Sequence, residues 1–172
     1  CLAVFCILFS SYLCDSGICG QENDGGKKVI KLYWFIPDGM RADPYTFNIY
    51  KWAEEGKLPN IRKMMQRGSY GYCKPVYPGH TPVNFASLLT GAYPEVHSIS
   101  DGAMHVQGYP LDRPAAVGWS STAKTVEPIW VTLEKRGRTV ALLSIPGSTP
   151  PELKNGYTLL GRWGNWGASF YA

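Results

Sequence analysis

The stretch YPGHTPVNFASLLTG, residues 77–91, decides the fold of this chain. Two prolines bracket a short loop, and an almost wholly apolar run then ends at Thr90-Gly91. Proline suits the first turn of a helix and glycine suits the position after its end, so the run predicts a buried helix over 82–90. Thr81 then stands at the mouth of this helix as its cap, with its hydroxyl near the positive end of the helix dipole.

Strands and helices alternate on both sides of this helix. The run KKVIKLYWFI is apolar, β-branched and aromatic, which is typical of a central strand covered on both faces. Alternation of this kind predicts an α/β fold with a doubly wound, largely parallel sheet and helices on both faces. The expected strands are 27–36, 70–77 and 138–145, and the expected helices are 47–55, 58–68, 82–90 and 125–137.

Residue types at the ends of these segments predict where they start and stop. Asn60 is the expected cap of the second helix, and Thr125 is the expected cap of the last, with Pro128 in its first turn. Cys73 is expected to be a small buried residue on the second strand. The segments 98–125 and 147–172 are rich in glycine, proline and aromatic residues and are expected to form surface loops.

The first residues differ in composition from the rest. Residues 1–14 are apolar and uncharged, and a small, polar segment follows. This pattern predicts a secretory leader over 1–26, before an export-competent domain over 27–172, with membrane contact only through an uncleaved leader. Four of the five cysteines lie in the leader, so the domain is not expected to be held by disulfide bonds.

The charge pattern argues against nucleic-acid binding. The net charge is +4 at pH 7, and the lysines and arginines are scattered along the 172 residues rather than clustered. Nucleic-acid readers usually carry a basic stripe. We therefore expect no such surface and favour a small-molecule partner.

Two polar residues follow predicted strands, where ligands bind in open α/β sheets. Asp38 follows the first strand, and Thr81 follows the second. A threonine hydroxyl becomes a nucleophile when a metal ion or a base removes its proton, and a carboxylate can hold such a metal. Taken singly, Thr81 is better explained as a helix cap, and Asp38 is better explained as an Asp-Gly turn residue. Together they favour metal-assisted chemistry.

Four blocks of the chain, in order, resemble the type I phosphodiesterase/nucleotide pyrophosphatase family of the alkaline phosphatase superfamily. The resemblance covers about residues 28–148. Its specificity comes from the order of the blocks, since one block alone would be weak. The blocks are VIKLYWFIPDGMRAD, LPNIRKMMQRG, PVYPGHTPVNFASLLTGAYPEVHSI and EPIWVTLEKRGRTVALLSIPGS.

The resemblance implies a metal-dependent hydrolase of phosphate diesters or nucleotides. Thr81 matches the family's nucleophile, which forms a phospho-threonine intermediate that water then hydrolyses. Asp38 matches an aspartate that binds one of two divalent metal ions, with zinc expected, and Thr81 contacts the metal as well. The expected partner is a small phosphate ester or nucleotide, and the expected location is extracellular or periplasmic.

The chain departs from the family at two positions of the site. Many members have Lys-Thr-Phe around the nucleophile, where this chain has His80-Thr81-Pro82. His80 is a candidate contact to the substrate phosphate from the lysine-like position. Many members also carry an asparagine that touches the phosphoryl oxygen, and the aligned residue here is Gly102. Both changes put nucleotide specificity in doubt.

The remaining metal ligands of the family come from its later half, and no matching motif occurs before Ala172. We therefore expect the chain to be the N-terminal part of a catalytic domain, truncated at both ends, incomplete at the C-terminus and inactive alone. The resemblance implies a structural rather than ligating role for His97.

Three other functions fit parts of the sequence. A sulfatase is disfavoured because Val83 and Phe85 replace the proline and arginine that its signature needs. A phosphomonoesterase or phosphotransferase of the same superfamily stays open, and so does a secreted binding protein that has lost catalysis. Hydrolysis that depends on Thr81 would separate the enzymes from the binding protein.

Overall fold

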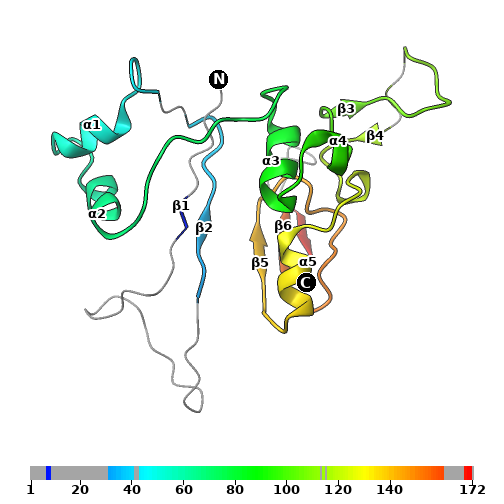
Figure 1. The fold of residues 1–172 in the computed structure, drawn as a ribbon. Helices are drawn as coiled ribbons and strands as arrows, with labels where there is room; N and C mark the ends of the chain where they lie inside the picture. Colours follow the sequence, from blue (N-terminus) through cyan, green and yellow to red (C-terminus); the bar gives the residue numbers. More distant parts are fainter. Residues whose placement is uncertain are drawn as a thin grey trace. The chain divides into compact units, whose positions relative to one another are not determined.

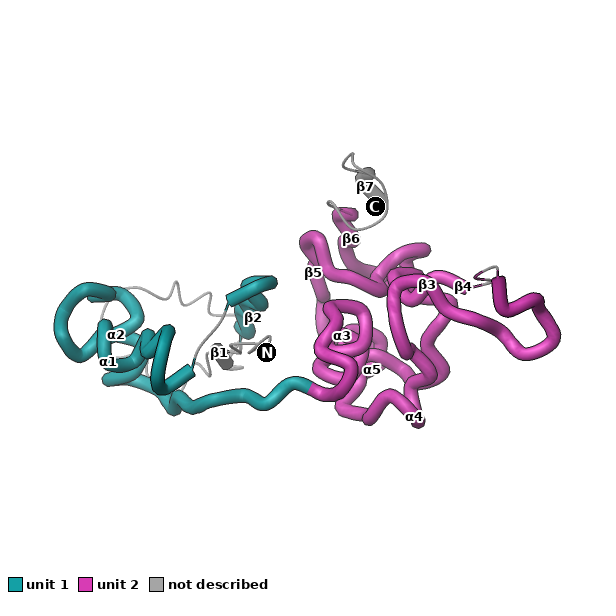
Figure 2. Tube along the Cα trace, turned by 90° about the horizontal axis from the view of Figure 1, so that it is seen from above, with its two compact units in different colours: residues 1–75 teal, residues 76–172 magenta. Residues whose placement is uncertain are grey.

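The computed structural model describes residues 7–8, 31–40, 43–112, 114, 116–160 and 169–171. The chain divides into two compact units, residues 1–75 and 76–172 (Figure 2). Each unit is described by itself.

The first unit is built around a pair of short helices, α1 (Ile49–Glu54) and α2 (Pro59–Arg67). The Asn48 side chain caps α1 by accepting a hydrogen bond from the Lys51 backbone N–H at 2.9 Å. One face of α1 is buried, and the larger apolar side chains nearby pack against it. The packed residues are Ile49, Tyr50, Met40, Trp52, Leu58 and Met65. The helices predicted over 47–55 and 58–68 are confirmed.

The start of α2 differs from the prediction. Leu58, not Asn60, is the N-cap, and no side chain caps this helix. Pro59 takes the first helical position, where its missing N–H and its fixed φ cost nothing. The helix therefore begins before Asn60, which becomes an exposed residue of the first turn.

The first predicted strand is short in the structure. Residues 27–30 lie outside the described residues, and the strand is β2 (Trp34–Phe35), which pairs antiparallel with β1 (Ile7–Leu8). The side chains of Tyr33 and Phe35 are exposed. The expectation of a long parallel strand covered on both faces is therefore wrong for the described residues, where the strand has two residues, pairs antiparallel and leaves both rings exposed.

The strand predicted over 70–77 does not form, and the segment is irregular. Tyr70 and Tyr72 instead pack on Tyr50 of α1, with ring centroids 4.8 and 5.1 Å apart, and the Tyr50 hydroxyl donates to the Gly71 carbonyl. Aromatic packing on a helix has replaced strand pairing here. Cys73 is consequently exposed rather than buried on a strand.

A sheet of three strands forms one layer of the second unit. β5 (Ala141–Leu143) pairs parallel with β6 (Tyr157–Leu160), and β6 pairs antiparallel with β7 (Ser169–Tyr171). β5 confirms the strand predicted over 138–145. β6 and β7 correct the expectation that 147–172 forms only loops, because β6 pairs with β5 from outside this segment and β7 then pairs with β6.

The helices of this unit are α3 (Thr81–Thr90), α4 (Pro94–His97) and α5 (Ile129–Lys135). α3 and α5 lie on one face of the β5–β6 pair (Figures 1 and 2). The core between them includes Val83, Leu89 and Trp130, which are almost completely buried. The prediction of a buried helix over 82–90 is confirmed.

Both helix caps predicted in this unit are wrong by one or more residues. His80 is the N-cap of α3 and Thr81 its first residue, while Pro128 is the N-cap of α5. Thr125, the expected cap of α5, instead donates its hydroxyl hydrogen to the Val96 carbonyl at 2.7 Å. The Thr125 hydroxyl thus bonds to α4 instead of capping α5.

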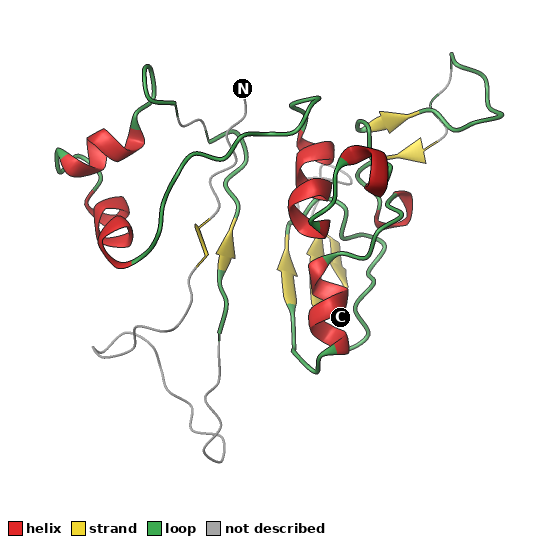
Figure 3. Cartoon of the chain, viewed as in Figure 1, coloured by secondary structure: helices red, strands yellow, loops and turns green. Residues whose placement is uncertain are grey.

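A small hairpin interrupts the segment that was expected to be loop. β3 (Ala103–Met104) and β4 (Ala116–Val117) pair antiparallel, and the 3₁₀ turn η1 (Ser121–Ala123) follows (Figure 3). Among the named strands of the described residues, only β5 and β6 are parallel. The described part of the chain is thus α/β without a doubly wound sheet. It also contains no helix that is both long and apolar enough to span a bilayer.

Candidate active site

Thr81 is the first residue of a buried ten-residue helix, α3. No side chain caps α3, and Pro82, its second residue, has no N–H. The first turn of a helix carries N–H groups without intrahelical partners and the positive end of the dipole. Thr81 is partly exposed at this end. The geometry therefore places a hydroxyl where a helix favours an anion.

The loop before Thr81 is held to α3 by one buried side chain. Asn84 accepts from the Val76 N–H at 2.9 Å and donates to the carbonyls of Pro78 at 3.1 Å and His80 at 2.9 Å. Asn84 therefore satisfies backbone groups of a turn that has no ladder of its own. Asn84 fixes the approach to Thr81, and its one signal in the sequence is that it is a polar residue inside an apolar run.

His80 is joined to a residue that sequence analysis missed. Its Nδ1 lies 3.1 Å from Oδ1 of Asp101, and the same oxygen accepts from the Gly102 N–H at 2.6 Å. These two hydrogen bonds, the backbone one first, hold the pKa of Asp101 below its usual value. Asp101 is 21 residues away along the chain, so only the tertiary structure brings it to the end of α3.

Gly102 is closely enclosed. A Cβ atom built there would lie 2.6 Å from Nε1 of Trp119, so any larger residue requires the indole to move. The Gly102 N–H bonds to Asp101 and its carbonyl accepts from the Gly118 N–H at 2.9 Å. Both backbone polar groups are thus engaged within the unit. Its contact with substrate stays a prediction.

The hydrogen bonds around His97 argue against Ser87 and His97 as a second nucleophile and base beside Thr81. The Ile99 N–H donates to Nδ1 of His97 at 3.0 Å, and Ser87 Oγ lies 2.9 Å from Nε2. A neutral ring that accepts at Nδ1 carries its hydrogen on Nε2, so it donates to Ser87 and cannot take its proton. His97 is fully buried, and burial lowers its pKa. This matches the structural role that was expected for it.

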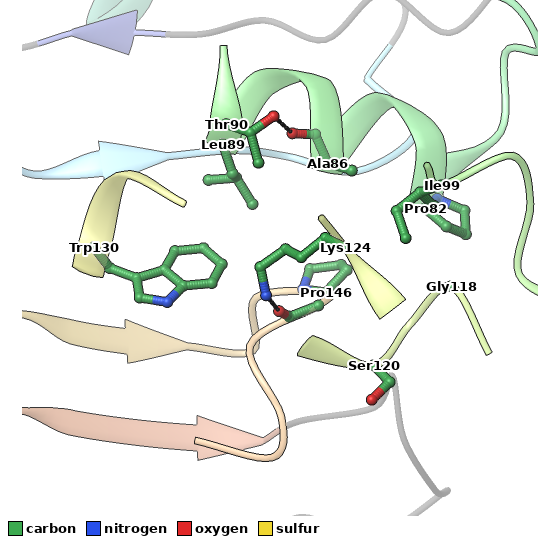
Figure 4. Close-up of a pocket in the computed structure, with 11 residues that line it drawn as sticks. Pro82, Ala86, Leu89, Thr90, Ile99, Gly118, Ser120, Lys124, Trp130 and Pro146 are labelled. Carbon is green, nitrogen blue, oxygen red and sulfur yellow. Dashed lines mark hydrogen bonds between the residues drawn. The ribbon is translucent and has the colours of Figure 1, made fainter. Parts of the chain in front are cut away.

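Beneath α3 lies a small cavity between α3, α5 and the loop after β5 (Figure 4). Lys124 reaches into it and donates to Oε2 of Glu152 at 2.7 Å and to the carbonyls of Ser121 and Gly147 at 3.0 and 2.9 Å. Trp130 Nε1 also donates to Glu152, at 3.1 Å. Burial lowers the pKa of Lys124 against the opposing effect of Glu152. The polar groups at this cavity therefore form hydrogen bonds with one another. We interpret the cavity as part of the packed boundary between these elements.

Asp38 lies in a turn just after β2, followed by Gly39 with φ +70°, a left-handed conformation that glycine adopts freely. Its side chain is exposed. Asp38 belongs to the first unit and Thr81 to the second. That both residues hold one metal ion therefore stays a prediction.

Comparison with known proteins identifies the family. The model of the family "Type I phosphodiesterase / nucleotide pyrophosphatase" matches residues 33–163. The chain belongs to this family. The matched range contains every site residue named above, including Asp38, Thr81 and Gly102.

Three relatives illustrate the similarity to this phosphodiesterase family. Human ectonucleotide pyrophosphatase/phosphodiesterase family member 1 is 36% identical over 121 residues, which is 66% of this chain and 12% of the relative. The venom phosphodiesterase of Macrovipera lebetinus is 32% identical over 126 residues, 68% of this chain and 13% of the relative. The venom phosphodiesterase of Naja atra is 31% identical over 122 residues, which is 68% of this chain and 14% of the relative. The chain thus spans about an eighth of these relatives' length. No solved structure matches it.

The phosphodiesterase family is metal-dependent, which raises the question of which side chains here could bind a divalent ion. The Asp38 carboxylate and the Thr81 hydroxyl are oxygen donors of the kind that such ions accept. Four ligands complete a typical zinc site. The described residues contain no group of three or more histidine, cysteine, aspartate or glutamate side chains able to hold an ion. Asp38 and Thr81 fit as part of a donor set, and the described chain does not complete it.

Proposed function

We propose that the protein containing this chain hydrolyses phosphate diesters of the nucleotide type, with Thr81 as the nucleophile. The observation that carries the proposal is the position of Thr81 as the first residue of α3, partly exposed, at an end that no side chain caps. An anionic phosphoryl group is favoured at such an end. Family membership supports the same chemistry.

The proposed reaction has two steps. The Thr81 Oγ1 attacks phosphorus, the bond from phosphorus to the leaving oxygen breaks, and the threonine proton is lost while the leaving group gains one. Water then attacks the phosphorus of the phospho-threonine, the bond from phosphorus to Oγ1 breaks, and Oγ1 regains a proton as the attacking water loses one. Two divalent ions, zinc by our expectation, would lower the pKa of the hydroxyl and neutralise phosphoryl charge when bound. Asp38 and Thr81 are the ligands that this chain would supply.

The other residues at the end of α3 have supporting roles in this proposal. His80 contacts a phosphoryl oxygen from the position before the nucleophile, and Gly102 lies near the same group. Asn84 holds the loop that carries His80, through its hydrogen bonds to the Pro78 and His80 carbonyls. Export of the protein, cleavage or retention of a leader over 1–26, and a doubly wound sheet in the complete domain are part of the same proposal.

The test uses the full-length protein and bis-(4-nitrophenyl) phosphate, with and without added zinc. We expect Thr81→Ala to lower kcat by at least about 1000-fold, because it removes the nucleophile. Thr90→Ala is the matched control, since Thr90 lies at the other end of the same helix and bonds to the Ala86 carbonyl. The control should keep its activity.

Acid quenching during turnover should trap phosphate on Thr81. A Thr81→Ala variant with unchanged rate would refute the nucleophile assignment. Faster hydrolysis of 4-nitrophenyl phosphate than of the diester would instead favour a phosphomonoesterase.

A further inference from the structure

The hydrogen bond between His80 and Asp101 is the feature of this site that the proposed reaction does not yet use. It joins the residue before the proposed nucleophile to a loop 21 residues later, with Nδ1 and Oδ1 3.1 Å apart. Both side chains are half exposed, at 61% and 51%. An exposed pair of this kind adds little to folding stability. Its position beside Thr81 suggests a role in the reaction instead.

The Asp101 carboxylate is itself held in place. Its Oδ1 accepts from the Gly102 N–H at 2.6 Å, and Gly102 is in turn bonded through its carbonyl to Gly118. A bulky neighbour, Trp119, closes the space on the other side of Gly102. The carboxylate oxygen therefore presents a fixed acceptor to the His80 ring.

The backbone of His80 is fixed as well, whereas its ring has a single anchor. The His80 carbonyl accepts from the Asn84 side chain at 2.9 Å and from the Asn84 N–H at 3.1 Å. Asp101 provides the one hydrogen bond that the ring makes among the described residues. Removing that acceptor would free the ring to rotate about its χ angles without disturbing α3.

The chemistry of the pair assigns the two ring nitrogens. An ionised carboxylate only accepts, so Nδ1 carries the hydrogen that points to Asp101, whichever charge the ring has. Nε2 is then the nitrogen that is left for a ligand. Carboxylates fix the tautomer and the orientation of functional histidines in the same way in other sites.

We propose that Asp101 is a positioning residue, which holds the His80 ring so that Nε2 is presented to the phosphoryl group attacked by Thr81. The proposal rests on the proposed function, because it needs a phosphate ester at the end of α3. It assigns to Asp101 an effect on substrate binding that passes entirely through His80.

A double-mutant cycle on the full-length protein tests this route, with bis-(4-nitrophenyl) phosphate as the substrate. We expect Asp101→Ala and His80→Ala each to raise KM by about tenfold, with a smaller change in kcat, as the loss of one directed contact predicts. In the His80→Ala background, Asp101→Ala should have no further effect, since coupled residues are not additive. Asp101→Asn keeps an acceptor oxygen and should restore most of the wild-type KM.

Two controls keep the outcome interpretable. Glu95→Ala removes another exposed carboxylate of the same unit and should leave KM unchanged. His80→Ala tests the proposal even where Asp101→Ala unfolds the protein, because it removes the contact that Asp101 is proposed to position. An equal rise of KM from Asp101→Ala in both backgrounds would overturn the proposal, and so would an unchanged KM in His80→Ala. Either result leaves the Thr81 assignment intact, which only the Thr81→Ala experiment can refute.

Discussion

At the scale of single residues, the site depends on Asn84 as much as on Thr81. Thr81 was predicted from its place between a loop and an apolar run, although as the cap of α3 rather than its first residue. Asn84 was not predicted, because its function is to bond three backbone groups of a loop whose path is known only from the structure. Local sequence identifies the proposed nucleophile, and only the packing shows the residue that holds the loop before it.

Replacing Asn84 with alanine should destabilise the protein. The change leaves the Val76 N–H without its acceptor and removes the side-chain hydrogen bonds to the Pro78 and His80 carbonyls, which keep their backbone donors. An unsatisfied buried group of this kind costs about 2 kcal/mol in the free energy of unfolding. Denaturant titration and the thermal midpoint of the full-length protein measure the change. Asn60→Ala, at an exposed position of α2, is the matched control and should change neither quantity. Equal midpoints for the two variants would contradict the role given to Asn84.

At the scale of elements, α3 and α4 are joined through the buried Ser87–His97 contact. His97 also accepts from the Ile99 N–H, which fixes the turn after α4. The sequence predicted a structural histidine only through the family resemblance. Only the packing of α3 against α4 shows that Ser87 is the partner of His97 Nε2.

This contact predicts a pH dependence of stability. Burial lowers the pKa of folded His97 below the 6.5 of an unperturbed histidine, so the unfolded state binds more protons between the two values. The contribution of His97 to stability is therefore fully present above about pH 6.5 and is lost as the pH falls toward the folded-state pKa. Thermal midpoints at pH 7.5 and 5.5 should differ less in His97→Gln than in the wild type. His105→Gln, at an exposed position, should retain the wild-type difference.

At the scale of the whole molecule, a buried lysine connects several segments of the second unit through its hydrogen bonds. Lys124, whose side chain is 5% exposed, bonds to Glu152 and to two carbonyls from different loops, and its Nζ lies 5.2 Å from the centre of the Trp130 ring. The first unit has its own apolar cluster around Tyr50. Two units with separate cores agree with the separate organisation of residues 1–75 and 76–172.

Lys124→Met should lower the free energy of unfolding by about 3 kcal/mol, because it leaves the Glu152 carboxylate without its buried partner. Adding Glu152→Gln should recover part of the loss, since the uncompensated charge is then removed. Lys135→Met is the matched control. Lys135 is 65% exposed and paired with Glu127, and breaking an exposed pair changes stability by less than about 1 kcal/mol. Chemical denaturation of the full-length variants measures all three, and similar losses for Lys124→Met and Lys135→Met would contradict this prediction.

The sequence by itself determined most of the helices, one strand and the position of the proposed nucleophile, Thr81, near the start of a helix. Periodic apolar residues specify α1, α2, α3 and α5 through local interactions, with a proline at the start of α2, α3 and α5 and a glycine shortly after the end of each helix, so these helices can be predicted without a structure. Four ordered motifs were also enough to indicate the family that the comparison confirmed.

The tertiary structure alone decided which residues meet. The segment 70–77 packs on Tyr50 instead of joining a sheet, β6 finds β5 across a long loop, and His80 finds Asp101. Each of these contacts joins residues 16 to 22 positions apart in the chain, and its free energy depends on burial and hydrogen bonds that neighbouring residues do not encode. Local propensity therefore fixes most helices of this protein, and long-range packing fixes its strand pairing and the surroundings of the proposed site.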